Sequence, residues 1–130
     1  RSLQKKAIRI CTHAEYLAHT DPLFWQMKTL HIQDIHFLQS AVFMFRYNSQ
    51  ELPGTFDTMF RLNSSVHNYP TRISMNIHLD NPKTALAHKS IRHSGPEIWN
   101  SLSFDLRKCR TKFNFKKHLK KQVLSKYLSC

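Results

Sequence analysis

The sequence predicts a mainly α-helical protein, a small bundle of about five helices with one short β-strand or hairpin near residues 73–93. Apolar residues recur at helical spacing along several stretches, whereas residues 73–79 alternate between apolar and polar side chains. The 130 residues are 41% hydrophobic, which is enough for one domain with a buried core. Because no apolar run approaches the 18 or so residues of a membrane span, we expect no membrane partner.

The first 62 residues carry helical patterns. Residues 3–14 place Leu3, Ala7 and Ile10 on one face, and a short helix is expected after Pro22. Residues 31–47 are apolar around most of a helical circumference, which predicts a helix buried on several sides. Its expected core stripe comprises Ile32, Ile35, Leu38, Val42 and Phe45.

The second half of the sequence combines a strand-like alternation with two further helical patterns. Alternating Ile73, Met75, Ile77 and Leu79 predict a half-buried strand. Ser94 and Glu97 form a capping-box pattern that predicts the start of a helix carrying Trp99 as a core anchor. The last helix, about 112–128, aligns four apolar residues at spacings of four: Phe115, Leu119, Val123 and Tyr127.

We therefore expect one compact unit with three subregions. Residues 1–62 form a helical part, 63–93 an irregular part with the short strand, and 94–130 a basic helical part. The chain begins with Arg1 rather than Met, which predicts a piece of a longer protein.

Charge is strongly uneven along the chain. The formal net charge is +12, of which residues 66–130 contribute +10 and residues 1–65 only +2. From Arg107 onward there are nine basic residues and no acidic one. This asymmetry favours a polyanion partner, because neutralising phosphates releases counterions; a lysine-rich surface kept for solubility is the alternative.

The sequence offers no complete active site. Three scattered cysteines without a CxxC pair predict reduced thiols and an intracellular protein, nuclear or cytoplasmic. A one-metal nuclease built on His67, Asn68 and His78 lacks a carboxylate partner. We therefore expect no catalytic residue, no metal, no cofactor and no small-molecule substrate, so that the segment is not an enzyme by itself.

Two sets of residues have binding chemistry. Tyr69, Thr71 and Arg72 place an aromatic plane, a hydroxyl and a guanidinium in one turn. These groups suit the binding of a stacked base or a phosphate. An equally weighted alternative is a structural turn in which Tyr69 packs on the core and Arg72 pairs with a carbonyl. The second set comprises Lys116, Lys117, Lys120 and Lys121, whose spacing suits backbone contacts without sequence reading.

Four segments in order resemble the C-terminal, post-palm region of jockey-like non-LTR retrotransposon reverse transcriptases. They are Leu17-Ala-His-Thr-Asp-Pro-Leu-Phe24, His67-Asn-Tyr-Pro-Thr-Arg72, Ser94-Gly-Pro-Glu-Ile-Trp-Asn-Ser-Leu102 and Phe115-Lys-Lys-His-Leu-Lys-Lys121. The family pattern is similar to H-x-Y-x-T-R, then G-x-x-I-W-N-x-L-P, then F-K-x-x-L-K. The sequence departs from it at Ser103, where the family has Pro, at Lys83, where it has Arg, and at Ala87, where Gly is common.

The resemblance implies that the parent chain is an RNA-directed DNA polymerase whose catalytic aspartates lie in an upstream palm. It suggests an accessory segment that binds template RNA or target DNA non-specifically, beside the remainder of the polymerase chain. Tyr69, Arg72 and the four lysines are the expected nucleic-acid contacts. Two alternatives stay open: a protein-docking module that packs on the polymerase through Phe115, Leu119, Val123 and Tyr127, or an independent small basic RNA-binding protein.

Overall fold

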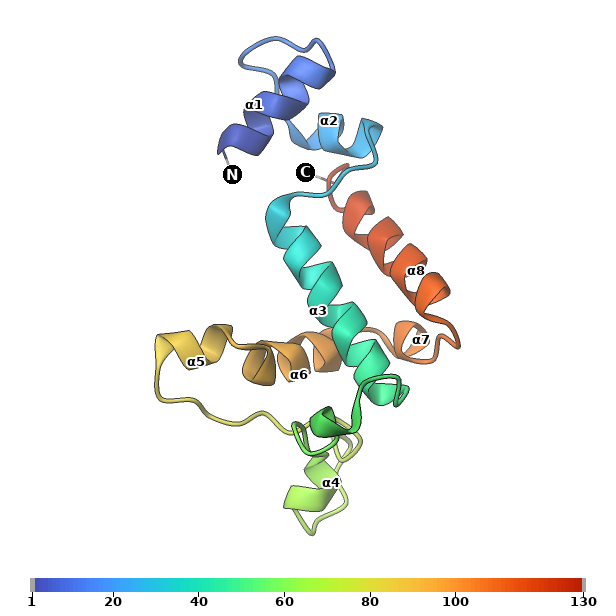
Figure 1. The fold of residues 1–130 in the computed structure, drawn as a ribbon. Coiled ribbons are helices and arrows are strands. Elements are labelled where there is room, and N and C mark those ends of the chain that lie inside the picture. The colour runs from blue at the N-terminus through green and yellow to red at the C-terminus, as the bar shows by residue number, and fades with distance from the viewer. Residues whose placement is uncertain (1, 130) are drawn as a thin grey trace. The chain divides into compact units, whose positions relative to one another are not determined.

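The computed structural model describes residues 2–129, and over this range the chain is mainly helical, as predicted (Figure 1). Four of the helices have ten or more residues, and the rest are short. In chain order the elements are α1 (Ser2–Cys11), α2 (Asp21–Gln26), α3 (Ile32–Asn48), the 3₁₀ helix η1 (Gly54–Phe56), α4 (Asn63–Val66), α5 (Ala85–Lys89), α6 (Ile91–Ser101), α7 (Phe104–Arg107) and α8 (Lys112–Ser125).

The chain divides into two units. Unit 1 combines Arg1–Leu38 with Lys116–Cys130, and unit 2 comprises Gln39–Phe115, so α3 and α8 each contribute residues to both. Unit 2 takes residues from all three subregions expected from the sequence.

Each unit has aromatic side chains at its centre. In unit 1, the ring of Phe24 lies 4.0 Å from that of His31, centroid to centroid, and Tyr127 packs edge-on against both. In unit 2, Phe45 stacks on Phe115 with ring centroids 4.7 Å apart. Trp99 is buried in unit 2, as predicted for a core anchor.

The two longest helices confirm the apolar periodicity. α3, predicted for about 31–47, spans Ile32–Asn48 and buries Leu38, Val42 and Phe45, although Ile32 and Ile35 in its first turns stay exposed. α8 buries the stripe predicted for it, and Tyr127 just beyond the helix end is buried as well. Thr111 precedes α8 and accepts a hydrogen bond from the N–H of Asn114 at 3.3 Å, which caps the helix.

Three helices end in the same way without glycine. His13, Lys28 and Gln50, each two residues past the end of α1, α2 and α3, have φ near +50°. The next residue then bonds back five positions, as Ala14 N–H does to the Arg9 carbonyl at 2.9 Å. This satisfies carbonyls at the helix ends, at a cost of about 1–2 kcal/mol for each left-handed side chain.

The strand predicted near residues 73–93 is wrong. In the described part of the chain this region forms turns over 72–75, one isolated antiparallel bridge between Leu62 and Ile77, and the helix α5. Of the alternating residues only Ile77 is buried, at 3% exposed, whereas Ile73 is 57% and Met75 77% exposed. Alternating apolar residues form one buried face only when the strand pairs with a second strand in a sheet, and no such strand is present among the described residues.

The capping box predicted at Ser94 is also wrong. α6 begins at Ile91 after Ser90, so Ser94 and Pro96 lie inside the helix. The hydroxyl of Ser94 donates to the Ser90 carbonyl at 3.0 Å, which uses it within the helix rather than at a cap. The thiols of Cys11 and Cys109 are free, and Cys130 lies outside the described residues.

Candidate nucleic-acid interface

Of the four predicted lysines of α8, Lys116 and Lys120 flank the buried stripe, and Lys117 and Lys121 lie on the opposite side of the helix. Lys116 and Lys120 are one turn apart, as are Lys117 and Lys121, so each pair is separated by about 6 Å along the helix axis. All four belong to unit 1, where Leu119 and Val123 are buried in the core. The helix thus presents the predicted lysines as one group.

These ammonium groups are available to a partner. Lys116, Lys117 and Lys121 are exposed and Lys120 is half-buried. α8 contains no acidic residue, and none of the four lysines forms an ion pair with another residue in the range 2–129. Their charge is therefore not neutralised within the described chain.

Tyr127 fixes the chain just after α8. Its hydroxyl donates to the Asp34 carboxylate and accepts a hydrogen bond from the backbone N–H of His31 at 3.1 Å. The imidazole Nε2 of His31 lies 3.2 Å from the Asp21 carboxylate. Burial, and then the hydrogen bond to Asp34, raises the pKa of Tyr127 well above its ordinary value. Tyr127 therefore stays neutral at physiological pH and holds this end of the lysine face in place.

Tyr69 and Arg72 lie together in the segment between α4 and α5, in unit 2. Tyr69 is 80% exposed, and Arg72 is exposed without an ion pair to any described residue. The alternative in which Tyr69 packs on the core is therefore not realised in this structure. Tyr69 and Arg72 belong to unit 2, whereas the four lysines belong to unit 1.

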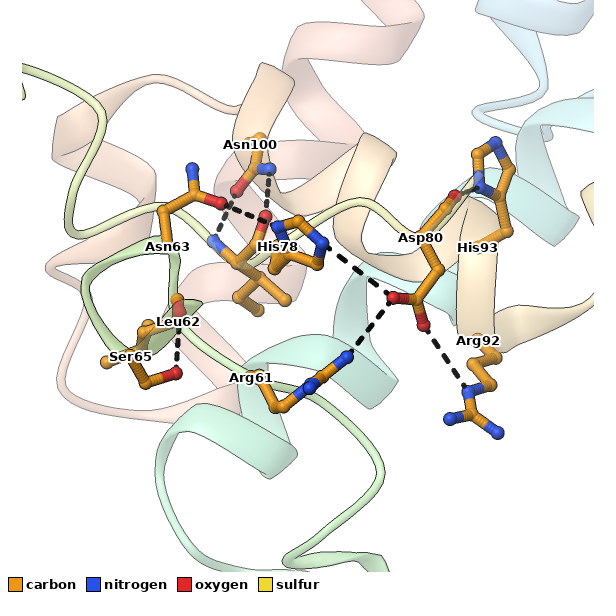
Figure 2. A network of polar contacts seen from close by, with 10 residues as sticks. Arg61, Leu62, Asn63, Ser65, His78, Asp80, Arg92, His93 and Asn100 are labelled. Carbon is orange, nitrogen blue, oxygen red and sulfur yellow. Dashed lines mark hydrogen bonds and ion pairs between the residues drawn. The ribbon is translucent and has the colours of Figure 1, made fainter. Parts of the chain in front are cut away.

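A network of polar side chains holds the base of this segment (Figure 2). Figure 2 shows Asn63 and His78 pointing toward each other, with Asn63 Oδ1 3.2 Å from His78 Nδ1. The side-chain amide of Asn100, on α6, donates to the Ile77 carbonyl at 2.8 Å and accepts from the Ile77 N–H at 3.1 Å. A single asparagine thus satisfies both backbone groups of a buried residue.

Asp80 is the charged centre of the same network. Its carboxylate lies 3.6 Å from Arg61, 3.7 Å from Arg92 and 3.8 Å from His78, and Figure 2 shows these groups converging on it. Its backbone carbonyl is 3.0 Å from Nδ1 of His93. Each ion pair is partly exposed and contributes at most about 1 kcal/mol, so the cluster positions the segment more than it stabilises the fold.

Sequence reasoning missed Asn63, Asn100 and Asp80. Each acts on a residue 10 to 23 positions away or on another element, and no spacing pattern signals such contacts. The rings of His67 and His78, considered above for a nuclease, lie 5.7 Å apart, centroid to centroid. Across residues 2–129, no three His, Cys, Asp or Glu side chains are grouped closely enough to hold a metal ion.

Comparison with protein-family models, curated proteins and solved structures finds no match for this chain. None of the helices described between residues 2 and 129 is long and apolar enough to cross a membrane.

Proposed function

We propose that this chain is an accessory segment of a retrotransposon RNA-directed DNA polymerase, and that it binds the backbone of template RNA or target DNA through the basic face of α8. The observation that carries the proposal is the group of four lysines on one helix, without an ion pair in the described chain and without an acidic residue on that helix. Phosphate binding by lysines gives affinity without sequence specificity. The retrotransposon context rests on the four sequence segments that resemble the family.

The proposal predicts a specific loss of salt dependence. Replacing Lys116, Lys117, Lys120 and Lys121 with Gln keeps helix propensity while removing four phosphate contacts. The slope of log affinity against log salt is about −0.7 per contact on a single strand and about −0.9 on duplex DNA. The slope is therefore expected to become shallower by about 2.8 on single-stranded RNA and about 3.6 on duplex DNA, as measured by fluorescence anisotropy.

A charge-matched control separates location from net charge. Lys6, Lys28, Lys83 and Lys89 are all exposed and lie outside α8, and replacing them with Gln also lowers the net charge from +12 to +8. We expect this control to keep most of the wild-type slope. Equal slopes for the α8 variant and the wild type would remove α8 from the proposed interface, and equal losses in both variants would leave only a general charge effect.

The same measurement addresses the docking alternative. That alternative uses Phe115, Leu119, Val123 and Tyr127 as a contact surface, and all four are buried within the folded chain. A chain that docks on the polymerase without touching nucleic acid would show the same weak binding in wild type and α8 variant.

A further inference from the structure

α4 and the residues that follow it form a closed loop, residues 63–77, which we call the Tyr69 loop. Backbone hydrogen bonds close its neck: the N–H of Asn63 donates to the Asn76 carbonyl at 2.9 Å, and that of Ser64 to the Ser74 carbonyl at 3.0 Å. The bridge between Leu62 and Ile77 lies directly beyond them. Loops whose ends meet in this way are compact and are frequently functional.

Side chains stiffen the same neck. The Asn63 amide donates to the Ile73 carbonyl at 3.0 Å, while its oxygen faces His78. Asn100 fixes the backbone of Ile77 from α6. Because these contacts hold both ends of the loop, the residues between them have fewer accessible conformations, which lowers the entropy cost of binding.

The tip of the loop carries an exposed aromatic ring beside a hollow. The hollow has a volume of about 230 Å³ and is lined by Asn63, His67, Tyr69, Thr71 and Ile73. This is below the roughly 300–1,000 Å³ of sites for drug-sized ligands, so it suits one planar ring system. Tyr69 contributes nothing to the core, yet it exposes a large aromatic face, which is the arrangement that stacks on unpaired bases.

A positively charged side chain, Arg72, lies close to Tyr69 in the sequence and could bind the phosphate of a stacked nucleotide. Arg72 follows Thr71 directly, is exposed and has no ion-pair partner among the described residues. A free guanidinium binds phosphate oxygens through paired N–H groups. The hydroxyl of Thr71 and the imidazole of His67 add hydrogen-bonding groups at the wall of the hollow.

We propose that the Tyr69 loop binds one unpaired nucleotide of a single strand, with its base stacked on Tyr69 and its phosphate bound by Arg72. This inference rests on the proposed function in that it concerns the same nucleic acid, but it involves different residues, which belong to unit 2. A base inside a duplex is stacked on its neighbours and presents no free face. The loop therefore gives the chain a preference for single strands that the lysines of α8 cannot supply.

The experiment compares three labelled probes of about 12 nucleotides: oligouridine RNA, an abasic single strand with the same number of phosphates, and duplex DNA. The variant Tyr69→Leu keeps apolar bulk and removes the aromatic face, whereas Tyr69→Phe keeps the face. The matched control is Tyr16→Leu, because Tyr16 is 76% exposed but lies outside the loop. All three variants are made in the full chain, and thermal unfolding checks that each keeps its fold.

Tyr69→Leu is expected to bind oligouridine about tenfold more weakly than wild type, with unchanged affinity for the abasic strand and the duplex. Tyr69→Phe and Tyr16→Leu are expected to bind all three probes as wild type does. Equal loss on all three probes, or no loss on oligouridine, would overturn the stacking role of Tyr69. Failure of the α8 lysine variant to change the salt slope refutes the proposed function separately, because that test does not involve Tyr69.

Discussion

Replacing Gly95 with Ala tests how closely α6 approaches Met44 of α3 within unit 2. A Cβ atom on Gly95 would lie 2.6 Å from Met44 Sδ and 3.4 Å from both Met44 Cγ and Ile91 Cδ1. Met44 is fully buried, so its side chain has no solvent space into which it could move. The substitution must therefore shift packed atoms rather than a free side-chain end.

Two opposing effects set the size of the change. Alanine improves helix propensity over glycine by about 1 kcal/mol. Overpacking a filled core costs about 1–3 kcal/mol, and a contact as short as 2.6 Å belongs in the upper part of that range. We therefore expect Gly95→Ala to lower the free energy of unfolding by about 1–2 kcal/mol, measured by urea denaturation followed by circular dichroism.

Two controls make the reasoning refutable. A Cβ atom on Gly54 would meet only the Asp57 carboxylate, at 3.6 Å, so Gly54→Ala should change stability by less than about 0.5 kcal/mol. In a Met44→Ala background the clash is gone, and Gly95→Ala should then be neutral or stabilising. If the single variant Gly95→Ala had the same free energy of unfolding as the wild type, α6 would not pack tightly against Met44.

Two further substitutions test the polar contacts that hold each unit. Asn100→Ala leaves the buried N–H and C=O of Ile77 without partners, so the free energy of unfolding should fall by about 2–4 kcal/mol and exchange of the Ile77 amide should accelerate; unchanged exchange would contradict this. Tyr127→Phe removes the hydroxyl that bonds Asp34 and His31 and should cost about 1–3 kcal/mol near neutral pH. Because the pKa of Tyr127 is raised on folding, the unfolded chain loses this proton first, so wild-type stability should fall above about pH 10. Tyr127→Phe should lack that part of the decline, and identical pH profiles for the two proteins would refute the assignment.

The long helices could be predicted because local pattern determines them. Phe115, Leu119 and Val123 repeat every four residues, which places them on one face of a helix. A strand would put the exposed Lys117 and Lys121 on that same face, so the pattern favours a helix. The same holds for Leu38, Val42 and Phe45 in α3. These stripes are buried wherever the chain finds a partner surface, so their prediction does not depend on knowing which surface that is.

The strand failed because a strand depends on a neighbour. Ile73, Met75 and Ile77 have the right alternation, but hydrogen bonding between strands requires a second extended segment in register. The chain instead tightens 72–75 into turns, and the bridge to Leu62 involves Ile77 alone. The sequence contains no local signal for that outcome, because Asn63 and Asn100, which fix it, are distant along the chain.

The candidate interface also has one part that depends on local structure and one that depends on contacts between distant residues. The lysines could be placed on one side of a helix because α8 is a local structure. The hollow beside Tyr69 could not be predicted, because it forms only when Asn63 hydrogen-bonds to the Ile73 carbonyl and the two ends of the loop meet. Sequence composition indicated the chemistry of Tyr69 and Arg72 but left open whether the ring faced the core or solvent.

The lysine face of α8 has a cost that bears on its role. Like charges one turn apart, as in Lys116 with Lys120 and Lys117 with Lys121, destabilise a helix by about 0.2–0.5 kcal/mol per pair. No acidic residue in α8 offsets the repulsion between these lysines. Burial of the apolar stripe and the hydrogen bonds of Tyr127 must therefore stabilise the helix. Solubility requires only that lysines be spread over the surface, and gathering four on one side of a helix adds repulsion without adding solubility. A bound polyanion would relieve this repulsion, which supports the proposed phosphate contacts.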